Sequence, residues 1–265
     1  ISRVISIIYF LPWLHQINHS WTFFQSQQPI ILWFHLFWME IMTAAANPAA
    51  SAPSDRTRVR RVATNAHYDA ATLHAIIDDG YLCHIAFSDD KGSHCIPTVC
   101  WREDNHLYIH GSNGSRMLKR LTQSDSCVTI THVDGLVLAR SAFSHSMNYR
   151  SAMVYGRFEV VTDEAQRRRA MELFMEKLIP GRQAEVRPGN DKEYAATTIM
   201  RIPLDEAACK VRSGGPNDDE EDMAWPVWAG VLPWTRAHTA PQRHEACTIE
   251  PPAYVRDWAT NTTAS

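Results

Sequence analysis

The stretch that decides our prediction of the fold is HGSNGSRMLKRL, residues 110–121. It follows a short apolar run at residues 107–109 that is typical of a strand, and it passes through Gly, Ser and Asn into a pattern typical of a helix. Ser115 stands where a helix N-cap is expected, and Arg116 then lies in the first turn. The sequence therefore predicts a strand, a tight loop and a basic helix, in that order.

The residue types of this loop suit a phosphate group. Small residues let a ligand approach the backbone closely, and a helix start offers free N–H groups with a partial positive charge. The guanidinium of Arg116 can hold a phosphate through two hydrogen bonds. Neither the P-loop pattern nor the dinucleotide-binding glycine pattern is present. An ordinary Gly- and Ser-rich loop without a ligand is the alternative.

Composition places the chain among ordinary globular proteins. With 265 residues, 45% hydrophobic and 21% charged, it is long enough for one sizeable core plus extensions. A net charge of -3 argues against a general nucleic-acid-binding protein. The six cysteines form no Cys-x-x-Cys pair, so we expect reduced, buried thiols in a cytoplasmic protein rather than disulfides or a zinc site.

The chain divides into three regions: an extension over residues 1–56, a domain over 57–234 and a polar tail over 235–265. Residues 1–41 hold two apolar runs, both shorter than the roughly 18–20 residues that span a bilayer. We expect this segment to be upstream sequence outside the folded protein. A membrane anchor or targeting segment is the alternative.

Short strands, tight turns and a few helices follow one another within the domain. We expect strands at residues 81–87, 94–101, 106–110, 126–132, 136–143, 151–161, 198–203 and 208–213, and helices at 69–78, 115–121, 163–178 and 190–197. Asp134 and Gly135 are expected to form a turn between two of the strands. Because alternating strand–helix–strand units are absent, the pattern predicts a mainly β fold, an antiparallel barrel with helices packed outside.

Three segments resemble the flavin-nucleotide-binding split-barrel family, the superfamily of pyridoxamine 5'-phosphate oxidase. The first joins IPTV at residues 96–99 to LYIHGS at 107–112, the second is HSMNYRS at 145–151 running into VYGR at 154–157, and the third is WAGVLP at 228–233. The closer resemblance is to the branch that holds flavin-nucleotide-binding proteins and nitroimidazole-resistance reductases.

This resemblance implies a homodimeric, six-stranded antiparallel split barrel that binds FMN at the subunit interface. Ser115 and Arg116 match the positions that hold the FMN phosphate. The other positions matched to the cofactor lie beside the flavin ring or its ribityl chain, on a neighbouring strand, or in a late tryptophan segment, and they are Pro97, Thr98, Val99, His110, Gly111, Ser112, Tyr149, Arg150, Ser151 and Trp228.

Two departures separate this chain from the oxidase itself. The oxidase places Lys directly after the phosphate-binding arginine, where this chain has Met117. The oxidase's basic pair for the substrate phosphate has no clear counterpart around residues 234–236. We therefore do not expect pyridoxal phosphate synthesis.

Several candidate side chains keep two or three interpretations. His110 is a flavin contact, a haem ligand as in haem-binding relatives of the barrel, or a strand-end histidine bonded to the backbone. Arg150 is a ligand clamp or the partner of a carboxylate. His145 is a proton shuttle or an exposed loop histidine. Trp228 contacts the cofactor or packs in the core.

No catalytic triad order, metalloprotease motif or metal site is legible, so any chemistry belongs to the flavin. We expect an FMN-dependent oxidoreductase that passes electrons from a nicotinamide donor, NAD(P)H, to a small acceptor, with a second copy of the chain as partner and with neither nucleic acid nor a membrane. The alternatives are a flavin-storing or flavin-sensing protein without activity and a haem-binding split barrel.

Overall fold

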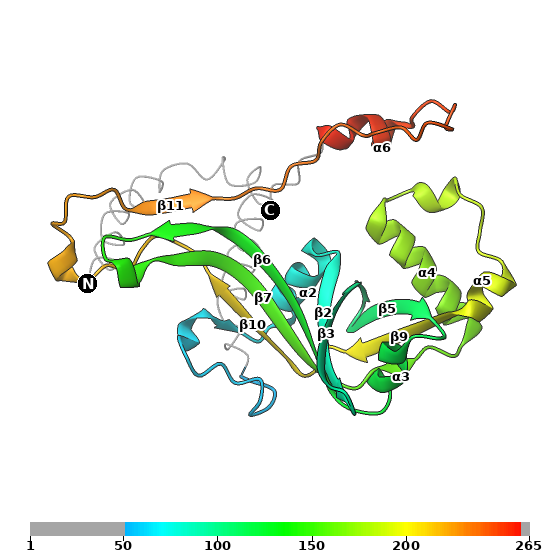
Figure 1. Ribbon diagram of the computed structural model, residues 1–265, viewed down its shortest axis with the longest axis horizontal. Helices are drawn as coiled ribbons and strands as arrows, with labels where there is room; N and C mark the ends of the chain where they lie inside the picture. Colours follow the sequence, from blue (N-terminus) through cyan, green and yellow to red (C-terminus); the bar gives the residue numbers. More distant parts are fainter. Residues whose placement is uncertain (1–50, 261–265) are drawn as a thin grey trace, which may run out of the picture. The chain divides into compact units, whose positions relative to one another are not determined.

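The computed structural model describes residues 51–260, so the expected upstream segment at residues 1–41 lies outside the described part. Two antiparallel sheets with helices around them make up this part (Figure 1). In chain order the elements are η2 (Ala63–Asn65), β1 (Ala66–His67), α2 (Ala70–Asp79), β2 (Leu82–Asp89), β3 (Gly92–Val99), β4 (Trp101–Glu103), β5 (His106–Ser112), α3 (Arg116–Leu121), β6 (Ser126–Leu138), η3 (Ala142–Ser144), β7 (Ser146–Gly156), β8 (Glu159–Val160), α4 (Glu164–Leu178), η4 (Arg182–Ala184), α5 (Asp191–Ala196), β9 (Thr197–Pro203), β10 (Ala207–Arg212), η5 (Glu220–Asp222), β11 (Gly230–Pro233), α6 (Ala253–Arg256) and η6 (Asp257–Ala259).

The larger sheet has the strand order β1-β10-β7-β6-β2-β3, and β11 also pairs with β6. β2 pairs with β6 near its start, at residues 127–129, and β11 pairs with it near its end, at residues 135–138. The long β6–β7 hairpin therefore continues past β2, and β11 takes the place beside it (Figure 1).

The smaller sheet has the order β4-β5-β9-β8. Only Cys100 separates β3 of the larger sheet from β4 of the smaller one, so the single strand expected at 94–101 is divided between the two sheets. The predicted class, mainly antiparallel β with flanking helices, is confirmed. The strand count differs from the expected six, partly because such long apolar runs are divided.

The main core lies between the two sheets. It joins Ile85 and Ile130 of the larger sheet to Ile109 and Ile202 of the smaller one, and α2 adds Ile76. A second apolar cluster fills the other face of the smaller sheet, where α4 packs on Trp101, Tyr108 and Ile199. Burial of this apolar surface, at about 25 cal/mol per Å², is the main force that holds the helices on the sheets.

Helix starts follow the sequence closely. The Asp69 carboxylate accepts from the Thr72 N–H at 2.8 Å, the Asp163 carboxylate accepts from the Gln166 N–H at 2.8 Å, and Asn190 forms a capping box on α5. Ser115 caps α3 by accepting from the Leu118 N–H at 3.4 Å, as expected. Each cap satisfies an N–H group that has no partner within its helix.

The turn expected at Asp134 and Gly135 does not exist. β6 runs unbroken through both residues, and the register with β7 shifts between Val133 and Gly135, which is a β-bulge. A side chain at Gly135 would place its Cβ 2.7 Å from the Leu232 carbonyl oxygen, so glycine is needed here for the approach of β11 rather than for a turn.

Between residues 51 and 260, no helix is both long and apolar enough to cross a membrane.

Candidate functional site

The loop between β5 and α3 is held by its neighbours. The Asn113 N–H donates to the Ala196 carbonyl at 3.2 Å, and the Thr198 hydroxyl donates to the Asn113 amide oxygen at 2.7 Å. The Arg116 side chain is 51% exposed, with its Nε 3.6 Å from Asp89 Oδ2. A half-exposed guanidinium beside the open first turn of a helix leaves this corner accessible to an anion.

Alternation along the strands separates the predicted cofactor residues into two faces of the larger sheet. Opposite residues of an antiparallel pair share a face. Pro97 pairs with His84, Ser151 with Thr131 and Tyr149 with Val133, on the face turned away from the core, which we call the outer face.

Thr98 and Arg150 lie on the opposite, inner face. Thr98 pairs with the fully buried Cys83, and Arg150 pairs with the buried His132. Val99 returns to the outer face, where it pairs with the exposed Leu82. The structure therefore brings Pro97, Val99, Tyr149 and Ser151 onto one surface and leaves Thr98 and Arg150 off it.

His84 belongs to the outer face, and our sequence reasoning missed it. Its exposed side chain lies between Pro97 of β3 and Thr129 of β6. The signal was available in β2, where buried and more exposed residues alternate from Leu82 to Ser88 and the polar His84 falls in the outward set.

His110 points to the other side of the smaller sheet, toward α4. Its ring lies 4.7 Å from Phe174 and 5.7 Å from Trp101, measured between ring centroids. Its Nδ1 atom is buried and has no hydrogen-bond partner among the described residues. Burial lowers the pKa of His110, so the ring is neutral near pH 7 and carries a free lone pair, the form in which imidazole binds a metal.

A cavity of about 260 Å³ lies on the same side, between α4 and α5. Thr197 lines it and pairs with Ser112, so Thr197 and His110 project from the same face of the smaller sheet. Met171 and Met175 of α4 form part of its apolar wall.

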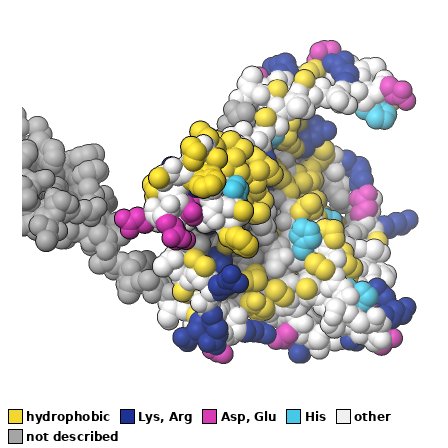
Figure 2. All heavy atoms as spheres, turned by 60° about the vertical axis from the view of Figure 1, so that its left-hand side comes forward, with side chains coloured by type: hydrophobic (Ala, Val, Ile, Leu, Met, Phe, Trp, Pro, Cys, Tyr) yellow, Lys and Arg dark blue, Asp and Glu magenta, His cyan; other side chains and the backbone are white. Residues whose placement is uncertain are grey.

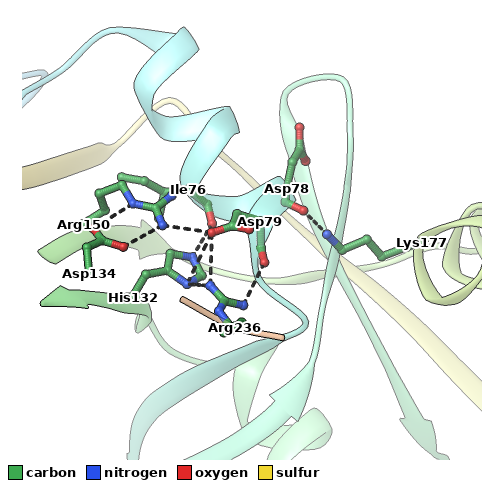
Figure 3. Close-up of polar contacts among 8 residues, drawn as sticks. All are labelled: Ile76, Asp78, Asp79, His132, Asp134, Arg150, Lys177 and Arg236. Carbon is green, nitrogen blue, oxygen red and sulfur yellow. Dashed lines mark hydrogen bonds and ion pairs between the residues drawn. The ribbon is translucent and has the colours of Figure 1, made fainter. Parts of the chain in front are cut away.

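The C-terminal end of α2 collects basic side chains from three elements (Figure 3). His132 Nε2 donates to the Ile76 carbonyl at 2.9 Å, Lys177 donates to the Asp78 carbonyl, and Arg236 Nη1 donates to the Asp79 carbonyl at 3.3 Å. Because the Gly80 N–H takes the Ile77 carbonyl, each of the last four carbonyls of this helix has a partner.

Arg150 is bound by carboxylates of the chain itself. Its Nε and Nη2 donate to the two Asp134 oxygens at 2.9 and 2.8 Å, and Nη2 also donates to Asp79 Oδ2 at 3.0 Å. Burial opposes ionisation of Asp79, but Arg236 and Arg150 outweigh it, so the pKa of Asp79 lies below its ordinary value. Of the two interpretations of Arg150, the carboxylate partner is the one that the contacts show.

Trp228 and Arg116 lie near opposite ends of β6. The Trp228 side chain is 63% exposed and precedes β11, which pairs with the end of β6, whereas α3 lies near the start of β6. A strand of 13 residues spans about 40 Å, so Trp228 and Arg116 of one chain do not meet around one flavin.

His145 and possible metal-binding clusters lie outside the surfaces described so far. His145 Nδ1 donates to the Ser141 carbonyl at 2.9 Å in an exposed position. In the part of the chain that the structure describes, no three His, Cys, Asp or Glu side chains gather as a metal site would require.

The fold and the loop before α3 define the class of an antiparallel split barrel with an anion-accessible corner. The sequence model of the pyridoxamine 5'-phosphate oxidase family matches residues 69–211. This match covers just over half of the chain, so the chain belongs to that family. No protein of the curated set matches it.

Two solved structures that are more than 30% identical to this chain agree with this assignment. The flavocytochrome Anf3 from Azotobacter vinelandii is 39% identical, covers 79% of this chain and 99% of its own, and superposes with a TM-score of 0.76. The FAD and heme binding protein from Mycobacterium smegmatis is 34% identical. It covers 74% of this chain and 97% of its own, and superposes with a TM-score of 0.70. A putative 5-nitroimidazole antibiotic resistance protein from Bacteroides thetaiotaomicron is 22% identical over 55% of this chain and 86% of its own, with a TM-score of 0.47.

Proposed function

We propose that this protein binds a flavin nucleotide and a heme and works as an oxidoreductase that passes electrons to a small acceptor. The observation that carries the proposal is similarity over about three quarters of the chain to a flavocytochrome and to a protein that binds FAD and heme. When bound, a flavin and a heme supply hydride acceptance and single-electron transfer.

The flavin part rests on the outer face and the corner at α3. Pro97 and Val99 of β3 and Tyr149 and Ser151 of β7 lie on this one face of the sheet, with β2 and β6 between the two strands. Ser115 and Arg116 stand at the helix start, where a phosphate finds N–H groups and a guanidinium. We leave Thr98 and Arg150 out of this site because both lie on the inner face.

FMN was the flavin expected from the sequence. Similarity to an FAD and heme binding protein favours FAD, and both nucleotides share the ring and the phosphate next to it. Release of the flavin by denaturation, followed by chromatography against both standards, decides between them.

The heme part rests on His110. A buried, neutral imidazole without a partner among the described residues, packed beside Phe174 and Trp101, would suit a ligand of the heme iron. The Gly111 and Ser112 positions follow it at the strand end, beside the loop that leads to α3.

Absorbance of the protein as isolated tests the proposal directly. Flavin bands together with a Soret band support it, and bleaching of the flavin bands by NAD(P)H with reoxidation by an acceptor supports the enzymatic part. Flavin without turnover would indicate storage or sensing instead. A chain that binds neither added flavin nor added hemin would contradict the proposal.

His110→Ala tests the heme ligand. We expect loss of the Soret band and of heme stoichiometry, with flavin content retained. His106→Ala is the matched control, because His106 lies on the same strand and the same face. Equal heme content in both variants would show that His110 is not the ligand.

Arg116→Ala tests the phosphate position. Loss of a charge-assisted hydrogen bond costs roughly 1.5–3 kcal/mol, so flavin should bind roughly 10- to 150-fold more weakly. Arg120→Ala is the control, because Arg120 shares the helix but donates to Gln123 and the Ser88 carbonyl. Unchanged flavin affinity in Arg116→Ala would show that the flavin phosphate does not bind at Arg116.

A second copy of the chain completes the proposal. Figure 2 shows hydrophobic side chains gathered on the side where β11 and the hairpin come forward. Trp225, Trp228 and Leu232, which lie in β11 or shortly before it, are exposed, and large exposed apolar patches mark interaction surfaces. In a homodimer with the flavin at the interface, Trp228 can reach the cofactor of the other copy. Light scattering on a sizing column should give twice the mass of one chain.

A further inference from the structure

We propose that a second cavity, formed where β11 leads into the C-terminal segment, binds a small molecule that carries a carboxylate on a flat apolar body. The cavity measures about 380 Å³, within the range of ligand pockets, and is lined by Val133, Asp134, Arg150, Pro233, Trp234, Thr235 and Arg236. It borders the outer face at Val133 but includes none of the residues proposed to hold the flavin or the heme.

Two guanidinium groups are brought together here by one carboxylate. Arg150 Nη2 lies 3.0 Å and Arg236 Nη2 lies 3.1 Å from the same Asp79 Oδ2 atom (Figure 3). Asp134 holds a second edge of Arg150. The two side chains are therefore fixed before any ligand arrives, which reduces the entropy lost on binding.

Each of the two guanidinium groups has one N–H donor that is not used in these contacts. Among the described residues, Arg150 Nη1 and Arg236 Nε have no acceptor, although both side chains line the cavity. Two N–H donors on neighbouring arginines match the two oxygens of a carboxylate.

The buried His132 helps to position Arg236. His132 is 6% exposed at its side chain, and its Nε2 donates to the Ile76 carbonyl, so Nδ1 is left as an acceptor. Arg236 Nη2 donates to that Nδ1 at 2.7 Å. A histidine in this tautomer holds Arg236 in place without adding a charge of its own.

Charge and shape restrict the ligand class. Arg150 and Arg236 carry two positive charges, and Asp134 and Asp79, which pair with them, carry two negative ones, so the cluster has no net charge. A cluster without excess positive charge disfavours a phosphate dianion more than a monoanion that accepts from the two free N–H donors. Trp234, Pro233 and Val133 supply apolar wall for a flat body.

Calorimetric titration with benzoate, and with benzamide as its uncharged counterpart, tests this site on the full chain. We expect benzoate to bind and benzamide not to bind. Arg236→Gln should weaken benzoate binding at least tenfold, whereas Arg243→Gln, an exposed arginine of the same segment paired with Glu250, should not change it. Equal binding of the two probes, no binding of benzoate, or an unchanged affinity in Arg236→Gln would overturn the proposal.

The carboxylate that binds in this cavity can belong to a free acid or to the propionate of a porphyrin. Hemin titrated in the presence and absence of saturating benzoate separates the two sources. Competition that disappears in Arg236→Gln assigns the site to a propionate, and independent binding assigns it to a free acid. Trp234→Leu supplies a second variant, in which benzoate should bind more weakly while the unfolding midpoint stays close to that of the parent.

Discussion

Arg56 and Glu206 join the segment before η2 to the turn between β9 and β10. Arg56 Nε donates to Glu206 Oε1 at 2.8 Å, and a second bond runs from Nη2 to the other oxygen. The hydrogen bonds from Arg56, with a further one from Ser54, lower the pKa of Glu206 to about 2.

The first prediction concerns the pH dependence of this pair. A carboxyl whose pKa is lowered on folding stabilises the folded state above its ordinary pKa of 4.5, and that contribution is lost as the pH falls from 4.5 toward 2. Glu206→Gln should therefore reduce stability at pH 7 by about 0.2–1 kcal/mol, the usual range for a partly exposed pair, and flatten the acid side of the profile.

Urea unfolding from pH 2.5 to pH 7 measures this effect. Glu245→Gln, a substitution in the C-terminal segment, serves as the control and should leave the profile as it is. Parallel profiles for the parent and Glu206→Gln below pH 4.5 would contradict the pairing.

For single residues, the sequence predicted local roles better than contacts with residues distant in the chain. Ser115 was identifiable as a cap because its acceptor role involves only the next three residues. The contacts of Arg150 were not, because Asp79 lies 71 positions away on a helix and the strand register alone decides that the side chain turns inward. His84 was missed for the same reason, since its place on the outer face depends on two neighbouring strands.

Among the elements, α2 depends on its C-terminal contacts. Lys177 of α4 donates to the Asp78 carbonyl and lies 5.0 Å from the centre of the Tyr81 ring. A cation at a helix C-terminus is worth about 0.3–1 kcal/mol and up to about 2 when partly buried.

Lys177→Met should therefore destabilise the protein by about 0.5–2 kcal/mol, because the Asp78 carbonyl loses its donor while the apolar stem is kept. Lys192→Met on the exposed helix α5 is the matched control and should stay within about 0.5 kcal/mol of the parent. Equal unfolding free energies for the two variants would mean that Lys177 does not support α2.

The bulge in β6 gives a second prediction for an element. Gly135→Ala places a Cβ 2.7 Å from the Leu232 carbonyl oxygen, and backbone cannot move aside as a flexible side chain can. We expect a loss of about 1–3 kcal/mol and faster amide exchange in β11. Gly215→Ala, where the new Cβ meets nothing within 4 Å, should be close to neutral.

The same strand shows where sequence patterns fail for elements. Asp-Gly is the strongest short signal for a hairpin turn, and the sequence therefore predicted two strands. β6 is continuous because β7 pairs along nearly its whole length and β11 needs a residue without a side chain at Gly135. Pairing partners so distant in the chain leave no local mark, whereas the helix caps at Asp69 and Asp163 do.

For the whole molecule, the segment after β11 is held to the domain at separate points. Arg236 contacts Asp79 and His132, and Tyr254 donates to Glu185 at 2.6 Å. Within the segment itself, the His238 ring stacks on Trp258 with centroids 3.9 Å apart. Residues after 211 also lie beyond the part that the family model matches.

Truncation separates these contributions. A chain that ends at residue 235 should lose about 1–3 kcal/mol, because the Asp79 carbonyl and His132 Nδ1 lose the donor that satisfies them, while the Asp79 carboxylate keeps only Arg150. A chain that ends at residue 238 keeps Arg236 and should recover most of this loss in urea unfolding. If both truncated chains unfold like the parent, the Arg236 contacts contribute nothing to the stability.

The path of the chain between its two sheets has a consequence for proteolysis. The backbone passes from one sheet to the other between β3 and β4, β5 and β6, β7 and β8, and β9 and β10, whereas α4 and α5 lie between β8 and β9 of the same sheet. A cut at residues 186–190 would give one piece with β1 to β8 and another with β9 to β11, and each piece supplies strands to both sheets. The two pieces of the nicked protein should therefore elute together from a sizing column and separate only when a denaturant is added.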